Sequence, residues 1–225
     1  MNPVKAVTDP GYKLQEVGLK SKDGMGLIFQ VNVFAPHFLI MLLLPQLKAG
    51  KAKIIWISSL RSDQKYLSLQ DLELLKTEEP YEGSKREIDL LHLATFKELK
   101  EMGITQYVTQ PGIFTSQAFS QFLNPFTYYG MLLMLYFARL MGSTWHTIEG
   151  YTAACAPVYV ALTSDKDCLQ QDIKYGSATY RNGDEYVKLQ ELDNTACLDV
   201  YSFIRKKELE WSKELLNSTT GGSSF

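Results

Sequence analysis

A compact apolar run and a second short strand, on either side of an amphipathic stretch, constrain the fold of this chain most. Lys53–Ser59 is compact and apolar, ends in two hydroxyl side chains, and is typical of a buried parallel strand. The spacing of apolar residues predicts an amphipathic helix over Tyr81–Met102, with Gly103 behind it. A second short strand is predicted over Thr105–Gln110, ended by Pro111-Gly112. Strand, helix and strand in this order predict a doubly wound α/β sheet, in which ligands bind outside the carboxyl ends of the strands.

A long apolar stretch precedes the first strand. Its periodicity predicts a helix over Asp23–Leu47, with Asp23 as the N-cap and Gly50 as the stop. The stretch is too apolar on all sides for a surface helix, so we expect it to be buried against the sheet.

The remainder of the chain shows no repeat or linker before its tail. Asn182-Gly183 predicts a hairpin, because Asn-Gly suits the positive φ that such turns need. The small, polar tail 217–225 is expected to be disordered. The other elements expected after the second strand are an aromatic-rich segment over 117–141, a helix over Thr147–Leu162, hairpin strands over Lys174–Tyr180 and Glu185–Gln190, and a last helix over Asp199–Leu216.

Charge and cysteine content exclude several functions. The 225 residues have a net charge of −2 and lack the basic surplus or stripe of a nucleic-acid-binding chain. Cys155, Cys168 and Cys197 share no metal-ligand spacing, and only three histidines could join them, so no metal site is expected. An odd number of cysteines also argues against a secreted disulfide framework, and no signal-peptide core follows Met1. These features predict a globular chain of a reducing compartment.

Tyr81 and Lys85 are the first candidates for catalysis. They are four residues apart at a helix start, so their side chains share one face. A neighbouring ammonium stabilises a phenolate and lowers the pKa of a tyrosine, which suits a proton donor to a developing alkoxide. Taken alone, the spacing favours a solvated Tyr-Lys pair on a helix surface, because about one such pair is expected by chance in a chain of this composition.

Two further polar residues occur near this pair in the expected fold. Ser59 closes the first strand, where its hydroxyl can bond a substrate carbonyl or satisfy the loop backbone. Asn32 lies four residues before Pro36, which has no N–H to donate to the Asn32 carbonyl. A helix kinked there could hold a water for proton relay, or the kink could serve packing alone.

The order of these residues resembles the short-chain dehydrogenase/reductase family. The match is closer to the fungal 3-keto-steroid reductases, which serve sterol C4 demethylation in ergosterol synthesis, and it covers nearly the whole chain except the tail. The matching stretches are Asn32-Val-Phe within 20–34, Ile57-Ser58-Ser59, Tyr66-Leu-Ser-Leu, Tyr81-Glu-Gly-Ser-Lys85-Arg, Gln110-Pro-Gly-Ile-Phe-Thr-Ser and Lys174-Tyr-Gly-Ser-Ala-Thr.

The resemblance implies a role for each matching residue. Tyr81 would donate the proton to the C3 ketone oxygen while NADPH delivers hydride to the carbonyl carbon. Lys85 would lower the pKa of Tyr81 and hold the nicotinamide ribose. Ser59 would orient the carbonyl, and Asn32 would anchor the relay water. The residues implied to contact the nicotinamide end of the cofactor are Ile113, Thr115 and Ser116, and the pattern leaves open which of the two hydroxyls serves.

One motif of the family is absent from the 225 residues. The family begins with a strand, turn and helix that carry Thr-Gly-x-x-x-Gly-x-Gly, whose backbone amides hold the pyrophosphate. No such spacing occurs here. We therefore expect residues 1–216 to be the C-terminal part of the fold, with an incomplete parallel sheet and about a hundred residues of nucleotide-binding half missing.

An uncharged aromatic segment lies where the family places its substrate lid. The segment 126–138 has 13 residues, whereas a membrane-spanning helix needs about 20. Apolar side chains with tyrosines at the rim suit a lid that touches sterol or a membrane interface. Ordinary core or dimer packing would give the same pattern.

The sequence and the resemblance together predict an NADPH-dependent reductase of the C3 ketone of 4-demethylated sterols. Tyr81, Lys85, Ser59 and Asn32 would carry the chemistry. The alternative is a non-catalytic module that binds sterol-pathway enzymes or the membrane surface. The resemblance further implies a sterol ketone substrate, partners among the sterol C4-demethylation enzymes, and a peripheral position on the endoplasmic reticulum membrane and lipid droplets.

Overall fold

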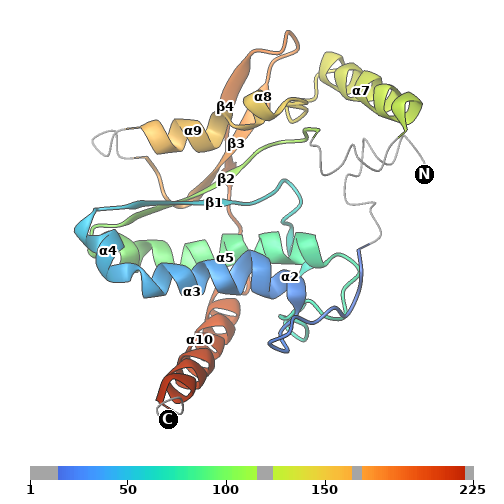
Figure 1. Cartoon of the computed structure of the whole chain (residues 1–225). Helices are drawn as coiled ribbons and strands as arrows, with labels where there is room; N and C mark the ends of the chain where they lie inside the picture. Colours follow the sequence, from blue (N-terminus) through green and yellow to red (C-terminus); the bar gives the residue numbers. More distant parts are fainter. Residues whose placement is uncertain (1–14, 116–123, 164–168, 221–225) are drawn as a thin grey trace.

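A single open sheet organises the protein. The computed structural model describes residues 15–115, 124–163 and 169–220. Its strands are β1 (Lys53–Ile57), β2 (Thr105–Gln110), β3 (Ile173–Thr179) and β4 (Glu185–Glu191), in the spatial order β1-β2-β3-β4 (Figure 1). The first three strands are parallel, and β4 runs antiparallel to β3. The carboxyl ends of β1 and β2 therefore lie at the same edge of the sheet.

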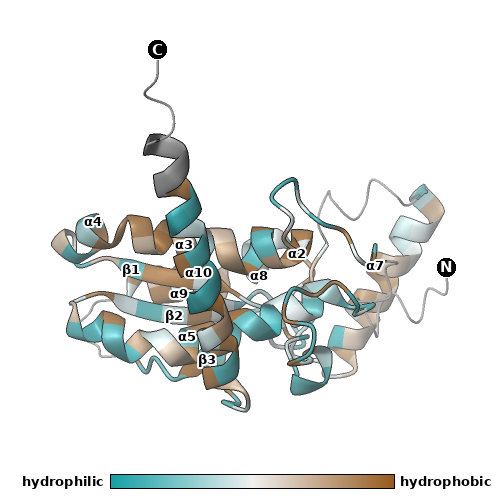
Figure 2. Ribbon diagram, turned by 90° about the horizontal axis from the view of Figure 1, so that it is seen from below, coloured by the Kyte–Doolittle hydropathy of each residue, from teal (hydrophilic) through white to brown (hydrophobic). Residues whose placement is uncertain are grey.

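Helices cover both faces of this sheet, which confirms the doubly wound α/β expectation. Ile54 and Trp56 of β1 pack into a core with α5 (Pro80–Glu101) and α10 (Cys197–Thr220). Ile55 points to the other face and packs with residues of the helix that precedes β3. This alternation of apolar side chains is what a strand buried on both faces requires. Figure 1 shows the strands between the two helical layers, and Figure 2 shows hydrophobic residues along β1.

The first helical stretch is broken where the sequence predicted one helix. It consists of α2 (Leu27–Phe29), a π-helical turn η1 (Gln30–Phe34), α3 (Ala35–Leu42) and α4 (Leu44–Ala49). The kink predicted at Pro36 is present as the π turn: Pro36 has no N–H, and the N–H of Ala35 bonds the carbonyl of Gln30 five residues back.

The predicted N-cap at Asp23 is wrong. The helix begins at Leu27, after Gly26, because residues 20–26 close a tight turn with a bridge between Lys20 and Gly26. Asp23 instead accepts a hydrogen bond from the side chain of Gln30 at 2.6 Å.

The elements nearest the candidate site agree well with the sequence. β2 has its predicted bounds, and α5 begins one residue earlier than predicted and ends at Glu101. The hairpin β3–β4 is present, but only Gly183 takes the positive φ, at 97°. A short 3-10 turn, η2 (Gln64–Tyr66), lies in the loop between β1 and α5.

Two other helices differ from their predicted bounds. The helix predicted over Thr147–Leu162 is split into α8 (Gly150–Ala153) and α9 (Cys155–Leu162). Ile148 takes a φ of 68° and forms a bridge with Phe114, so no helix can pass through it. The last helix continues through residues 217–220, which were predicted to be disordered, and residues 221–225 lie outside the described part.

The aromatic segment forms one amphipathic helix. α7 (Pro125–Leu140) begins at Asn124, whose side chain accepts a hydrogen bond from the N–H of Thr127 at 2.8 Å. Its inner face buries Met131 and Leu135. Among the residues that the structure describes, no helix combines the length and apolar character needed to cross a membrane.

Glu87 is a buried carboxyl on α5 that has an expected effect on stability. Its side chain is completely buried, and neither carboxyl oxygen has a hydrogen-bond partner in the described part of the chain. Burial, with a smaller contribution from the charge of Asp71, raises the pKa of Glu87 well above its ordinary value. The folded state therefore holds this proton at a pH where the unfolded chain has lost it, so stability falls as pH rises above the ordinary carboxyl pKa.

We expect Glu87→Gln, which mimics the protonated carboxyl, to remove this loss of stability at high pH. The free energy of unfolding at pH 8 should rise by about 1 kcal/mol or more, and its decline between about pH 5 and pH 8 should become shallower. Urea unfolding at several pH values measures both. Glu101→Gln, at an exposed position of the same helix, is the control, and an equal change in the two variants would contradict the prediction.

Candidate functional site

The start of α5 is attached to the end of β1 by Lys85. Its ammonium donates a hydrogen bond to the carbonyl oxygen of Ile57 at 2.9 Å and lies 5.2 Å from the centre of the Tyr81 ring. Tyr81 and Lys85 thus share one face of the helix, as their spacing predicted. The buried Ser58 adds a second contact, from its hydroxyl to the carbonyl of Lys85 at 3.4 Å. The Tyr-Lys pair is therefore fixed against the end of β1, just before the loop that carries Ser59.

The pKa of Tyr81 is shifted in the direction opposite to the one that the sequence predicted. Burial raises the pKa of Tyr81, and the neighbouring charge of Glu82 raises it further. Burial also lowers the pKa of Lys85, partly offset by Asp89. The predicted lowering of the Tyr81 pKa is wrong for this structure, because burial and the charge of Glu82 act in the opposite direction. Tyr81 consequently stays protonated at neutral pH, as a proton donor must.

Ser59 lies in the loop that follows β1, beside the attached helix start. Its Oγ accepts a hydrogen bond from the backbone N–H of Arg61 at 3.1 Å. Its carbonyl oxygen accepts one from the ammonium of Lys174 at 3.2 Å and one from the hydroxyl of Ser62 at 3.2 Å. In the part of the chain that the structure describes, no acceptor is recorded for the hydroxyl proton of Ser59, which leaves that proton available to a bound carbonyl.

Asn32 reaches the same helix start through its side chain. Its amide nitrogen Nδ2 donates to the hydroxyl of Ser84 at 2.9 Å, and that hydroxyl donates to the carbonyl of Tyr81 at 2.6 Å. The sequence predicted a role for the backbone carbonyl of Asn32 only. The structure therefore adds a side-chain link between the π-helical turn and the helix that bears Tyr81.

The residues after β2 lie at the same edge of the sheet but contact a different segment. The N–H of Ile113 bonds the carbonyl of Trp145 at 2.7 Å. Both the N–H and the hydroxyl of Thr115 bond the carbonyl of Ile148, at 2.9 Å and 3.0 Å. Ser116 lies outside the described residues. Contacts thus link Asn32 through Ser84 to Tyr81, and Lys85 to the end of β1, while Ser59, Ile113 and Thr115 bond to other residues near the carboxyl ends of β1 and β2.

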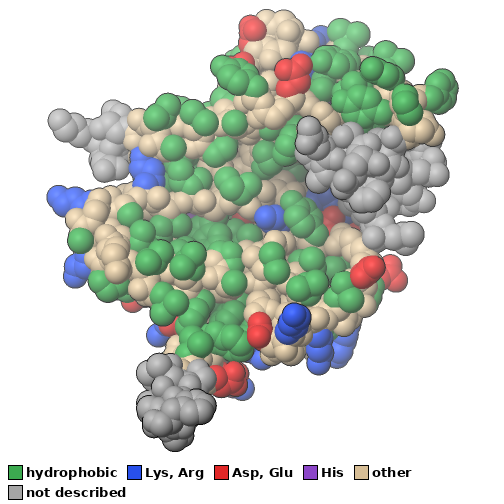
Figure 3. Space-filling view, in the orientation of Figure 1, with side chains coloured by type: hydrophobic (Ala, Val, Ile, Leu, Met, Phe, Trp, Pro, Cys, Tyr) green, Lys and Arg blue, Asp and Glu red, His purple; other side chains and the backbone are tan. Residues whose placement is uncertain are grey.

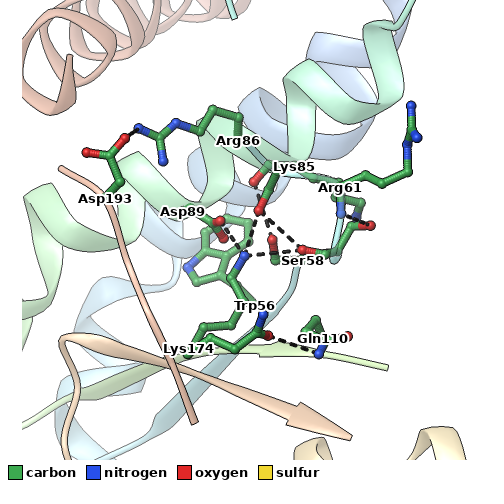
Figure 4. A network of polar contacts seen from close by, with 12 residues as sticks. Trp56, Ser58, Arg61, Lys85, Arg86, Asp89, Gln110, Lys174 and Asp193 are labelled. Carbon is green, nitrogen blue, oxygen red and sulfur yellow. Dashed lines mark hydrogen bonds and ion pairs between the residues drawn. The ribbon is translucent and has the colours of Figure 1, made fainter. Parts of the chain in front are cut away.

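Two ion-pair groups beside Ser59 were not predicted from the sequence. Arg61 bonds the carboxylates of Glu82 and Glu79, each at 3.0 Å. Lys174 bonds Asp89 at 2.5 Å deep inside the protein (Figure 4). The available signal was the position of Asp89, four residues after Lys85 on one helix face.

Lys85 and the Tyr81 hydroxyl are the described groups that would hold a nicotinamide ribose at this edge of the sheet. Both donors of Thr115, in the segment after β2, are already used by the carbonyl of Ile148, which leaves its hydroxyl oxygen as an acceptor. The Gly-rich turn that would hold a pyrophosphate does not occur in the sequence. Among the described residues, no group of three or more His, Cys, Asp or Glu side chains is placed to hold a metal ion.

Comparison with known proteins gives a consistent set of relatives. The chain is 62% identical to the 3-keto-steroid reductase of Saccharomyces cerevisiae over 214 residues, which are 95% of this chain and 62% of that protein. It is 57% identical to the 3-keto-steroid reductase of Eremothecium gossypii, over 100% of this chain and 64% of that protein. The 3-keto-steroid reductase of Kluyveromyces lactis is also 57% identical, over 95% of this chain and 62% of that protein. The chain therefore spans less than two thirds of the length of these relatives.

More distant comparisons add little. A short-chain dehydrogenase from Streptomyces avermitilis superposes with a TM-score of 0.42 at 17% identity, covering 99% of this chain and 75% of that chain. No model of a known protein family matches the sequence.

Proposed function

The chain is a homologue of the fungal 3-keto-steroid reductases, and on that premise we propose that it takes part in reducing a sterol C3 ketone to the 3β-alcohol with NADPH, in ergosterol synthesis. The substrate class is a 4-demethylated sterol intermediate. The observation that carries the proposal is the Tyr81–Lys85 pair attached to the end of β1 beside Ser59, in a chain 57–62% identical to these reductases.

Tyr81 is the proton donor in this proposal. Its raised pKa keeps the phenol protonated until a more basic oxygen develops on the substrate, when transfer becomes favourable. The Ser59 hydroxyl donates a hydrogen bond to the same carbonyl oxygen and stabilises its developing charge. Bound NADPH supplies the hydride to the carbonyl carbon.

Lys85 and Asn32 support the donor. The Lys85 ammonium, held by the Ile57 carbonyl, lies 5.2 Å from the centre of the Tyr81 ring and keeps a positive charge beside the donor. It also donates to the nicotinamide ribose. Asn32 keeps the π-helical turn against Ser84, where a water can pass a proton towards Lys85.

A purified preparation of the chain tests this function directly. We expect saturable NADPH binding, followed by oxidation of NADPH and formation of a 3β-alcohol when a 4-demethylated sterol 3-ketone is added. Absence of both binding and turnover would reject the enzymatic proposal for this chain. NADH, titrated in parallel, tests the choice of dinucleotide.

A second candidate function rests on the outer face of α7. Several large apolar side chains are exposed there, and Figure 3 shows them gathered at one end of the molecule. They are Phe126, Tyr129, Leu133, Tyr136, Phe137, Leu140 and Met141. An exposed apolar face with tyrosines suits shallow insertion into a lipid surface. We propose that it holds the protein on the endoplasmic reticulum membrane or a lipid droplet, near other sterol C4-demethylation enzymes, with or without turnover.

This surface gives a binding prediction of its own. Phe126 and Leu133 are 91% and 70% exposed, so changing both to serine should leave the fold intact. We expect binding to phosphatidylcholine vesicles, measured by co-sedimentation, to weaken by more than about tenfold, because each inserted side chain contributes about 1.5–3 kcal/mol. The control changes Leu162 and Leu198, which are 80% and 75% exposed on other helices, to serine. Equal binding of both variants would contradict the proposal.

A further inference from the structure

Lys174 has an unusual environment for a lysine. It comes from β3 and is only 5% exposed, and its ammonium has three partners (Figure 4). It donates to the carboxylate of Asp89 at 2.5 Å, to the hydroxyl of Ser62 at 2.7 Å and to the carbonyl of Ser59 at 3.2 Å. An ammonium has three N–H donors, so each of them is used.

These contacts join three separate parts of the fold. Asp89 lies on α5, four residues after Lys85 and eight after Tyr81, so the three side chains follow one face of the helix. Ser59 and Ser62 lie in the loop after β1, and Lys174 lies on β3. The Asp89–Lys174 pair therefore fixes the distance between the helix that carries Tyr81 and the loop that carries Ser59.

A purely stabilising role explains this arrangement poorly. Removing two charges from water is costly, and apolar residues of similar size often serve stability equally well. The cost is not fully offset here, because the second carboxylate oxygen of Asp89 is buried and has no hydrogen-bond partner among the described residues. Asp89 and Lys174 also line a cavity of about 400 Å³, together with Ser62, Arg86, Gln190 and Asp193.

We infer that Asp89 and Lys174 form a positioning pair for the catalytic serine, an inference that rests on the proposed reductase function. The ammonium holds the Ser59 carbonyl, and the backbone N–H of Arg61 holds the Ser59 hydroxyl oxygen from the other side. Together they orient the Ser59 hydroxyl towards the position where Tyr81 donates its proton. Neither Asp89 nor Lys174 touches the substrate.

The test replaces the pair by apolar residues of similar size. The double variant Asp89→Leu with Lys174→Met should fold, since exchanging a whole buried pair is tolerated where breaking it is not. We expect kcat for sterol ketone reduction to fall by about 10- to 100-fold with KM nearly unchanged, because small misplacements of a catalytic group cost up to about 100-fold. The matched control is Lys206→Met with Glu210→Leu, an exposed ion pair of α10, which should leave kcat unchanged.

A cycle with Ser59→Ala separates positioning from general damage. If the pair acts through Ser59, the double variant should lower kcat little further once that hydroxyl is gone. An equally large further loss in the Ser59→Ala background would overturn the inference. So would an unchanged kcat in the double variant.

Amide hydrogen exchange over residues 58–62 provides a readout independent of turnover. We expect faster exchange there in the double variant and unchanged exchange in the Lys206–Glu210 control. If the double variant does not melt cooperatively, Ser62→Ala removes one partner of the ammonium and leaves the ion pair in place. Unchanged kcat and unchanged loop exchange in Ser62→Ala would then overturn the inference. A wild-type chain without turnover would count against the proposed function, whereas the exchange result would still decide the positioning role.

Discussion

Replacing Tyr81 by phenylalanine should lower kcat for sterol ketone reduction by about 10²- to 10⁴-fold, the usual contribution of a positioned proton donor. The change removes one hydroxyl from a side chain that is 43% exposed, so the melting temperature should stay close to that of the wild type. Steady-state kinetics with NADPH and a sterol 3-ketone, together with a thermal melt, measure both quantities. Tyr180→Phe, at a half-exposed position beside the hairpin turn, is the matched control.

The direction of the Tyr81 pKa adds a dependence on pH to this prediction. Because burial raises that pKa, the phenol is protonated throughout the neutral range. It loses its proton only as the pH rises past the raised pKa. We therefore expect no fall in wild-type kcat between about pH 7 and pH 9 from this group. A decline across that range which Tyr81→Phe abolishes would show that Lys85 lowers the Tyr81 pKa during the reaction, against the resting geometry.

Gly112→Ala should cause the largest loss of stability among the predicted variants. Gly112 ends β2 with a φ of 76°, and an added Cβ would lie 2.7 Å from the carbonyl of Trp145 and 2.8 Å from the side chain of Thr147. Left-handed strain costs about 1–2 kcal/mol and overpacking about 1–3 kcal/mol, so we expect a total of about 2–5 kcal/mol. Urea unfolding measures this loss.

Gly103 offers a matched control for the steric part. Its φ of 82° is nearly the same, but nothing lies within 4 Å of an added Cβ. The free energy of unfolding of Gly103→Ala should therefore fall only by the cost of left-handed strain, about 1–2 kcal/mol. Equal losses in the two variants would show that the segment around Trp145 yields easily, and that the residues after β2 are less firmly held than the contacts of Ile113 and Thr115 indicate.

The sheet and the helix that bears Tyr81 could be predicted because their signals are local. Thr105–Gln110 is a short stretch with Pro and Gly directly behind it, and it forms a strand with the predicted bounds. The spacing of Tyr81 and Lys85 on a helix places both on one face whatever surrounds them. Ser59 could be predicted as a site residue because it stands at the carboxyl end of a predicted parallel strand, where ligands bind in such sheets.

The rest depends on contacts between distant segments, which periodicity does not reveal. Lys174 finds Asp89 across 85 positions of sequence, and nothing next to either residue indicates an ion pair. The break at Ile148 follows from a bridge to Phe114, since an isolated stretch of that composition favours one helix. The raised pKa of Tyr81 follows mainly from burial, and the spacing of residues along a helix does not specify that.

Because of the π-helical turn, the direction in which Asn32 points depends on the number of residues in Gln30–Phe34. One residue advances an α-helix by about 100° around its axis, so a turn with one extra residue offsets the segments on its two sides by roughly that angle. Shortening Gln30–Phe34 by one residue would restore regular pairing, but it would turn Asn32 relative to α3 and away from Ser84. A deletion there would therefore act on the helix that bears Tyr81 even if every remaining side chain were kept, so the length of this segment is constrained as well as its composition.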